Sequence, residues 1–305
     1  DASAGIARHD PPFVQRTDKA GRVIRPSLDT INDVRSLMGK HRRDALAETI
    51  SVERRGAATI IAIARPDRRN ALNESVAEEI GAALDAAERD AACRAVVLTG
   101  VGDRAFCAGG DLQPGADGTP FTIDVSDPRH YVVRLLKRMD ACRLPLVARV
   151  NGAALAGGLG LVCACDLVVA DERAIFGVSE VKVGLFPMMI LPYLLRSIPY
   201  KTMMELCLTG EPVKVEEARA IGLVNHVAPA GELDARTDWL LSRIVDKSPT
   251  GIRLGKQALS KIREMSTESA LEYAQFMLAN MARTKDAIEG FAAFNEKRAP
   301  NWTGK

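Results

Sequence analysis

The sequence predicts an α/β fold, and three observations favour it. Short apolar runs alternate along the chain with segments whose apolar residues recur at helical spacing. The 305 residues, 47% of them hydrophobic, are enough to bury one large core. Residues 151–166 (NGAALAGGLGLVCACD) follow an apolar run, are rich in small residues, and continue as an apolar segment that suits a helix. This stretch is expected to be the strand–helix turn around which the domain is organised.

The first half of the predicted domain alternates strands and helices. Residues 59–64 (TIIAIA) and 95–99 (AVVLT) are apolar and rich in β-branched residues, which is typical of buried strands. Between them, Asn73 is a suitable N-cap for a helix over residues 74–89, whose apolar residues share one face. A second helix is expected over residues 129–141.

The second half continues this alternation and then becomes helical. Residues 146–150 and 167–170 are expected to be strands on either side of the glycine-rich stretch. Residues 175–185 are expected to form a short strand and a loop, followed by an apolar segment through Ile198. A short helix should end at Gly222, and helical spacing fills the rest of the chain over about 232–247, 250–264, 267–283 and 285–298.

Residues 1–50 differ from the rest of the chain. Charges of both signs are mixed with prolines, and apolar residues are sparse before Ile31. An amphipathic helix is expected within residues 31–46, and disorder before about Ser27. The segment is interpreted as a partly disordered N-terminal arm; contact with a partner subunit remains an alternative.

The composition argues against several classes of protein. A net charge of +2 gives no general affinity for nucleic acid or an anionic membrane, and no apolar run approaches the roughly 20 residues that span a bilayer. No secretory signal is expected, since the first ten residues contain no apolar core. Six cysteines without a disulfide or CxxC pattern indicate reduced thiols in an intracellular protein. The four histidines are scattered, so no metal site is expected.

The sequence lacks several common catalytic and nucleotide-binding motifs. Gly158-x-Gly160 lacks the third glycine of a dinucleotide fingerprint, because Cys163 stands at that position. The sequence contains neither a GxxxxGK[ST] phosphate loop nor an HExxH zinc motif. The string from Gly177 to Val181 lacks the last glycine of a nucleophile elbow.

Two glycine-rich loops and one glutamate remain as candidates for chemistry. Residues 105–112 (AFCAGGDL) and 151–160 each follow a predicted strand, so each loop can supply a backbone N–H group to the same oxygen atom. Paired N–H donors of this kind suit a thioester enolate. Glu180 lies among valines, and burial would raise its pKa toward the range useful for proton transfer. A tightly packed turn and a solvent-facing loop glutamate are the alternative interpretations.

From Ser51 to Lys305 the chain resembles the crotonase (enoyl-CoA hydratase/isomerase) superfamily. The resemblance depends on six segments in the expected order: RPDRRNALN from Arg65, AFCAGGDL, NGAALAGGLGLVCACD, FGVSEVKVGLFP, TGEPVKVEEARAIGLVNHV and EGFAAFNEKRAPNW. It implies a crotonase-like ββα spiral core over residues 51–245, after the N-terminal extension 1–50, and a C-terminal helical trimerisation region over 246–305. It further implies an acyl-CoA substrate, no separate cofactor, a homotrimer or a hexamer of stacked trimers, and a cytoplasmic location.

The resemblance also implies roles for individual residues. The amides of Gly110 and Gly157 would form the oxyanion hole, and Glu180 would be the catalytic acid/base. The residues implied to contact coenzyme A are Ala108 through its backbone near the adenine, Arg68, Arg69, Arg104 and Lys297. Lys297 would reach in from a neighbouring subunit. A solvated charge is the alternative for each basic residue.

One departure from the family pattern bears on the reaction. Hydratases of this family usually carry two glutamates that share a water; Glu180 matches the second, but Gly160 stands at the position of the first. Met188 also replaces a usual glycine, which would narrow the water site. By residue type alone, the candidates for a replacement carboxylate are Asp124, Asp127 and Glu205, and those for the acyl pocket are Phe121, Tyr131, Met188, Met189 and Leu191.

The sequence therefore predicts an enzyme that stabilises a thioester enolate, and hydration is expected first because it is the more frequent reaction in the family. Isomerisation of the double bond by Glu180 alone is the runner-up. A non-catalytic acyl-CoA-binding protein is the alternative from another class, and hydrolase or decarboxylase chemistry on the same fold is a third option.

Overall fold

A computed structural model describes residues 49–112 and 129–305 of the chain. Most of the predicted N-terminal arm lies outside these residues, as do Phe121, Asp124 and Asp127. None of the helices in these residues combines the length and the apolar character that a membrane-spanning helix requires.

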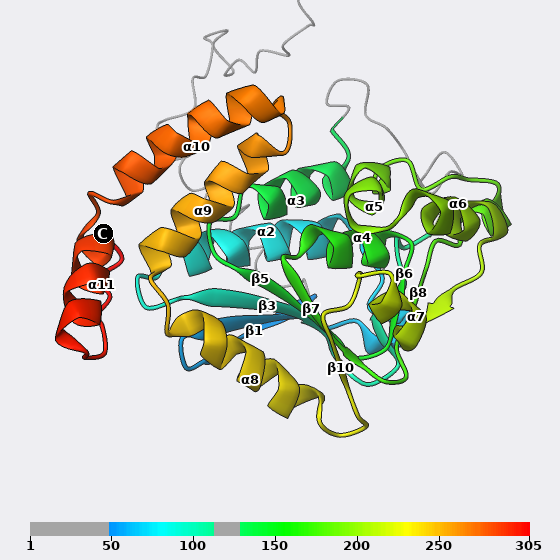
Figure 1. Cartoon of the computed structure of the whole chain (residues 1–305). Coiled ribbons are helices and arrows are strands. Elements are labelled where there is room, and N and C mark those ends of the chain that lie inside the picture. Colours follow the sequence, from blue (N-terminus) through cyan, green and yellow to red (C-terminus); the bar gives the residue numbers. More distant parts are fainter. Residues whose placement is uncertain (1–48, 113–128) are drawn as a thin grey trace, which may run out of the picture. The chain divides into compact units, whose positions relative to one another are not determined.

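The fold is built on a six-stranded sheet with the order β1-β2-β3-β5-β7-β10 (Figure 1). β1 and β2 form an antiparallel hairpin that turns at Gly56, where φ is +56°. The other neighbouring strands run parallel. The strands are β1 (Ile50–Arg55), β2 (Ala58–Ile63), β3 (Ala95–Gly100), β5 (Leu146–Val150), β7 (Leu167–Asp171) and β10 (His226–Ala228).

Helices cover both faces of this sheet, which is why its central strands are apolar on both sides. One face packs against helices that include α2 (Glu74–Arg89), α3 (Tyr131–Asp140) and α4 (Gly157–Ala164). The other packs against α8 (Leu233–Val245), where Leu240 and Leu241 meet Val97 and Val169. Asn73 caps α2 as predicted, since its side chain accepts a hydrogen bond from the Val76 amide at 3.0 Å.

A small second sheet positions the glycine-rich loops. It has the order β4-β6-β8-β9, from β4 (Ala105–Cys107), β6 (Ala153–Leu155), β8 (Ile175–Gly177) and β9 (Val213–Lys214). β4, β6 and β8 are parallel neighbours, and β9 is antiparallel to β8. The carboxyl ends of three adjacent parallel strands therefore lead into residues 108–111, 156–157 and 178–180 at one edge.

The predicted strands and helices are largely confirmed, but several short elements were missed. The missed strands are β1, β4, β6 and β9, and β4 lies in a segment that was predicted to be a glycine-rich loop. The 3₁₀-helix η2 (Glu180–Val183) likewise replaces a predicted loop. The apolar segment before Ile198 is α5 (Leu191–Ser197), the missed α6 (Tyr200–Thr209) follows it, and the predicted short helix is α7 (Val215–Ala220). Strands of two or three residues, such as β6 and β9, are too short for a hydrophobic period to appear. β1 has six residues but only one of them, Ile50, is buried, so it has no apolar pattern.

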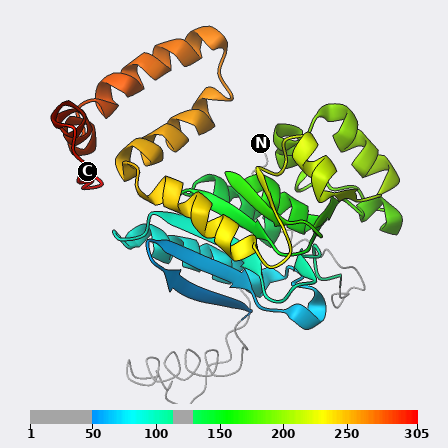
Figure 2. The same ribbon diagram turned by 60° about the horizontal axis from the view of Figure 1, so that its bottom comes forward.

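Three helices complete the chain: α9 (Pro249–Ile262), α10 (Thr267–Met281) and α11 (Lys285–Glu296). Each begins and ends close to its predicted position, and Figure 2 shows α10 and α11 standing apart from the sheet. Large apolar side chains on both helices are exposed in the single chain: Leu271, Phe276, Leu278, Ile288, Phe291 and Phe294. The predicted boundary at residue 245 coincides with the end of α8, and the division into functional regions stays a prediction.

Asp286 connects the C-terminal segment to the start of α9 through hydrogen bonds. Its carboxylate accepts hydrogen bonds from the Thr303 amide at 2.7 Å, the Gly304 amide at 3.0 Å and the Ser248 hydroxyl at 3.0 Å. Burial by itself would raise the pKa of Asp286, but these hydrogen bonds and one from the Thr250 amide lower it to about 2.

This lowered pKa predicts an acid-dependent loss of stability. Because the pKa of Asp286 is lower in the folded than in the unfolded protein, its ionised carboxylate stabilises the folded state at pH values above the unfolded-state pKa. This stabilisation is lost as the pH falls from about 4 to about 2. Over this window, we expect the free energy of unfolding to fall by about 1–2 kcal/mol more in the wild type than in Asp286→Asn. Denaturant unfolding at several pH values measures this difference. Substitution of the exposed Glu216 by Gln is the control, and identical pH profiles for wild type and Asp286→Asn would contradict the prediction.

Candidate active site

A cavity of about 330 Å³ lies at the edge where β4, β6 and β8 end. Gly110, Gly157, Glu180 and Ala108 line it together, so the two predicted loops and the predicted glutamate meet at one place. The rest of the wall is mostly apolar and comprises Leu112, Tyr131, Val132, Ala156, Ser179, Val183, Leu185, Phe186, Pro187, Met188, Met189 and Ile190. Such a cavity suits an apolar ligand that has one polar end.

Backbone hydrogen bonds to Leu72 fix the first loop and leave the Gly110 amide without an acceptor in the described residues. Leu72 donates its amide to the Gly109 carbonyl at 2.7 Å, and the Asp111 amide donates to the Leu72 carbonyl at 2.7 Å. This parallel bridge uses the backbone on both sides of Gly110, and within the described residues the Gly110 amide donates to no acceptor. Gly109 has a φ of +102°, which favours glycine there.

The second loop brings another amide beside it. Gly157 is the first residue of α4, so its N–H group has no partner within the helix, and no acceptor for it exists in the described part of the chain. A methyl group built on Gly157 would lie 3.7 Å from the Gly110 nitrogen, so the two residues are direct neighbours. The preceding residue, Ala156, has a φ of +50°, a strained conformation of the kind found at functional sites.

Glycine is also required where α4 packs against β4. A Cβ atom on Gly158 would lie 2.1 Å from the Cys107 carbonyl oxygen, which no side chain tolerates. The close approach brings the N-terminus of α4 next to the loop that carries Gly110. Two residues with unpaired amides, one of them at the N-terminus of α4, thus line the cavity together. Amides aimed at one oxygen atom would stabilise that atom as it gains negative charge.

Glu180 is the first residue of η2 and is partly buried in the cavity wall. Its Oε2 atom is buried and has no hydrogen-bond partner. Burial raises the pKa of Glu180, and a hydrogen bond from its own backbone N–H group only partly offsets that rise. No other carboxylate among the described residues lines this cavity. A lone carboxylate with a raised pKa and a free oxygen is suited to accept and return a proton.

Ile190 fills the space beside Gly160. A Cβ atom on Gly160 would lie 2.3 Å from Cγ2 of Ile190, whose side chain is 3% exposed. Met188 lines the cavity with a side chain that is 68% exposed, and the prediction that it narrows the water site stays a prediction. The isoleucine excludes a carboxylate at residue 160 unless the wall is rebuilt.

This contact predicts a strong coupling between the two positions. Gly160→Ala should lower the free energy of unfolding by about 1–3 kcal/mol, because the new methyl group overlaps the isoleucine. In an Ile190→Ala background the same change should cost much less, and chemical denaturation of all four proteins measures the coupling. Additive effects of the two substitutions would contradict the packing. Gly81→Ala is a matched control, since a Cβ atom there meets nothing within 4 Å.

The other predicted residues divide into two groups. Tyr131 and Met189 line the cavity as predicted, whereas Leu191 packs against the core and Glu205 is exposed on α6, so neither forms part of the wall. The four basic residues predicted to contact coenzyme A are exposed and lie outside the cavity wall: Arg68, Arg69, Arg104 and Lys297. Their predicted contacts with coenzyme A stay predictions.

Sequence reasoning gave no role to a buried polar cluster behind the first loop. Arg65 donates from Nη1 to the Ala71 carbonyl at 2.6 Å and from Nη2 to Oδ2 of Asp111 at 2.7 Å. Both charged side chains are less than one-fifth exposed. The Asn70 side chain accepts from the Arg65 amide at 3.1 Å and donates to the Ala105 carbonyl at 2.7 Å. The cluster thus fixes the backbone on both sides of Gly110.

Comparison with known proteins gives consistent matches over the globular part of the chain. The family model described as enoyl-CoA hydratase/isomerase matches residues 53–305. A Thermus thermophilus protein named provisionally as an enoyl-CoA hydratase is 39% identical, covering 83% of this chain and 100% of that protein. The 2,3-dehydroadipyl-CoA hydratase of Escherichia coli is 32% identical, with coverages of 83% and 98%. The crystal structure of an enoyl-CoA hydratase from Mycobacterium tuberculosis matches with a TM-score of 0.76 and 35% identity, covering 85% of this chain and 100% of that one.

Proposed function

The chain belongs to the enoyl-CoA hydratase/isomerase family, and on that premise we propose that it hydrates 2-enoyl-CoA thioesters. Relatives named as enoyl-CoA hydratases, which match most of the chain at 32–39% identity, support this activity. The observation that carries the proposal is the pair of unpaired amides, Gly110 and Gly157, in one cavity with the buried, unpartnered oxygen of Glu180.

The oxyanion hole is the first part of the proposed mechanism. The thioester oxygen accepts hydrogen bonds from the Gly110 and Gly157 amides. As water attacks C3, the π electrons of the C2–C3 bond move toward C1, and negative charge develops on that oxygen. Because the amides are held in place before the reaction, they stabilise the enolate without reorganisation.

Glu180 supplies the proton transfers. Its carboxylate takes a proton from water as the water oxygen bonds to C3, and it returns that proton to C2 of the enolate. The enolate electrons re-form the thioester carbonyl, so one water has been added and Glu180 is again ionised. The raised pKa of Glu180 makes the protonated form easier to reach. Coenzyme A enters only as part of the substrate, so no separate cofactor is proposed.

Ile190 favours a second candidate reaction. Because it fills the space beside Gly160, the cavity has one carboxylate among the described residues rather than two that share a water. Glu180 alone can remove a proton from C2 of a 3-enoyl-CoA and return it to C4, which moves the double bond from C3–C4 to C2–C3 through a dienolate whose oxygen the same two amides would hold. Isomerisation is therefore the alternative that this wall supports.

One assay separates these reactions. The protein is incubated with 2-enoyl- and 3-enoyl-CoA thioesters of several chain lengths, and the products are identified by mass and by chromatography. A gain of one water from a 2-enoyl-CoA supports hydration, whereas a moved double bond at unchanged mass supports isomerisation. Binding of the thioesters without turnover would contradict both reactions and indicate a non-catalytic acyl-CoA-binding protein.

The proposal includes a homotrimer or a hexamer in which the C-terminal helices meet neighbouring subunits, and Lys297 reaches the coenzyme A of a neighbour. Support comes from the apolar side chains exposed on α10 and α11, since an apolar surface of this kind marks an interaction site. Phe291→Asp with Phe294→Asp is expected to yield a smaller species in light scattering, while Lys201→Asp on α6 should leave the assembly unchanged. A cytoplasmic location is also proposed, because six free cysteines fit a reducing compartment.

The ion pair of Arg65 and Asp111 is expected to position the oxyanion hole. Arg65→Gln or Asp111→Asn should lower kcat by about 10- to 100-fold with a smaller change in KM, because a displaced amide costs transition-state binding. The double variant should be little worse than either single one. Arg54→Gln, which breaks the more exposed pair with Asp90, is the control and should leave kcat unchanged. An unchanged kcat in both single variants would show that the ion pair does not position the oxyanion hole.

A further inference from the structure

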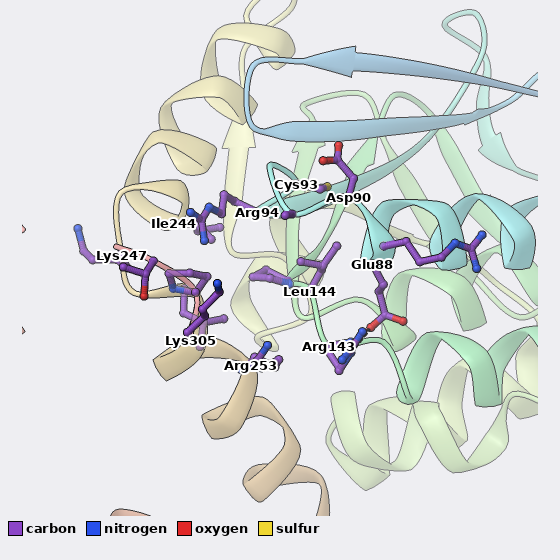
Figure 3. A pocket seen from close by; sticks show the side chains of 17 residues that line it. Glu88, Asp90, Cys93, Arg94, Arg143, Leu144, Ile244, Lys247, Arg253 and Lys305 are labelled. Carbon is purple, nitrogen blue, oxygen red and sulfur yellow. Dashed lines mark hydrogen bonds and ion pairs between the residues drawn. The ribbon is translucent and has the colours of Figure 1, made fainter. Parts of the chain in front are cut away.

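A second cavity, of about 280 Å³, lies apart from the proposed active site and shares no lining residue with it. It is formed by the C-terminal end of α2, residues 90–94, residues 143–145, the end of α8, the first turns of α9 and the last three residues of the chain. Figure 3 shows these segments around one opening. Nothing in the proposed reaction uses this cavity.

Its two acidic residues are already engaged with cations. Glu88 pairs with Nη2 of Arg138 at 2.7 Å and accepts from the Arg143 amide at 2.6 Å, and the pKa of Glu88 is lowered even though burial would raise it. Asp90 pairs with Arg54 at 2.5 Å. Neither carboxylate is therefore free to neutralise the remaining positive charges of the cavity.

Within the described residues, four cations of this wall have no counter-charge: Arg89, which is exposed at the end of α2, and Arg94, Arg253 and Lys305. Among the residues that the structure describes, no carboxylate lies within 4.0 Å of the side-chain nitrogens of Arg94, Arg253 or Lys305, and these side chains make no hydrogen bond. Arg94 and Arg253 are both partly buried, and Nη1 of Arg94 lies 3.6 Å from the place where Gly304 would carry a Cβ atom. Like charges in one partly enclosed space repel each other, and a bound anion would remove that repulsion.

The rest of the wall limits the size and character of the anion. A volume near 280 Å³ is slightly below the usual range of ligand pockets, roughly 300–1,000 Å³, and suits a small ligand. Guanidinium groups bind phosphate oxygens in a two-pronged geometry, which favours a phosphate over a simple halide. Apolar side chains complete the wall and suit a small organic body: Leu144, Pro145, Ile244, Pro249 and Ile252.

We propose that this cavity binds a small phosphate-bearing molecule through Arg94, Arg253 and Lys305. The site is independent of the acyl-CoA cavity, so the proposal stands whether or not the reaction above is correct. An acidic segment of a neighbouring protein is less suited, because the charges line a pocket rather than a flat surface.

Titration calorimetry of the full chain with inorganic pyrophosphate tests the proposal. We expect saturable binding in the wild type, and binding weakened at least tenfold in Arg94→Gln with Arg253→Gln. The control, Arg219→Gln with Arg263→Gln, removes two exposed arginines outside the cavity and should bind pyrophosphate as the wild type does. Ligand binding should also raise the Tm of the wild type and of the control, but not of the cavity variant.

Three results would overturn the proposal. They are the absence of saturable binding by the wild type, equal binding by the cavity variant, and displacement of pyrophosphate by an acyl-CoA, which would assign the binding to the substrate site. The cavity variant should keep the wild-type turnover of enoyl-CoA, so failure of this site and failure of the proposed reaction are distinguishable. Arg94→Lys with Arg253→Lys keeps both charges and should bind with intermediate affinity.

Discussion

Glu180→Gln is expected to lower kcat by about 10²–10⁴-fold while the binding of acyl-CoA persists, because the amide fills the same space but cannot carry the proton. Steady-state kinetics and calorimetry with an unreactive thioester measure the two effects separately. Glu205→Gln is the matched control, since this glutamate is exposed on α6 and should be dispensable. An unchanged kcat in Glu180→Gln would remove Glu180 from the mechanism.

The raised pKa of Glu180 predicts that both kcat/KM and the stability of the protein depend on pH. Since the carboxylate form must be present to start hydration, kcat/KM should fall on the acid side at a pH above the usual pKa of a glutamate. A pKa raised in the folded state also means that stability is lost as the pH rises from the unfolded-state pKa to the folded-state pKa. Above that window Glu180→Gln should therefore be more stable than the wild type, and the difference should shrink in acid.

Gly157→Pro is expected to lower kcat/KM by about 10²–10³-fold, the cost of losing one oxyanion donor. Gly157 is the first residue of α4, where proline is favoured in helices because the N–H group has no helical partner. The substitution thus removes the amide hydrogen at a helical position that accepts proline. The proline ring also disfavours the φ of +50° and ψ of −123° of Ala156, so part of the loss would come from a displaced loop. Kinetics with a 2-enoyl-CoA, together with circular dichroism to check the fold, measure the effect.

Gly157→Ala is the control for this substitution. It keeps the N–H group and adds a methyl group 3.3 Å from Cδ1 of Leu72, the flexible end of a side chain, so only a several-fold loss is expected. If the proline variant stays within tenfold of the alanine variant, the Gly157 amide does not stabilise the transition state.

The local features of the site could be predicted from the sequence because each lies in a short segment. Small residues after an apolar run indicated both loops, and the valines around Glu180 indicated its partial burial. Asn73 marked the start of α2 because its type and position alone make an N-cap.

Features that depend on contacts distant in sequence could not be predicted. Ile190 packs over Gly160 across thirty positions, and Arg65 reaches Asp111 across a separation of 46. Neither residue type is unusual in its own segment, so no local pattern marks the contact. The second cavity is likewise assembled from four segments that are distant in sequence, 88–94, 143–145, 244–253 and 303–305, and no segment alone indicates that their charges share one space.

The most direct measurement is a crystal structure of Glu180→Gln with a bound 2-enoyl-CoA. The account predicts that the thioester oxygen lies about 2.7–3.1 Å from the amide nitrogens of both Gly110 and Gly157. It also predicts that the side chain of residue 180 faces C2 and C3 of the acyl group. A thioester oxygen bonded to neither amide, or an acyl group bound outside this cavity, would contradict it.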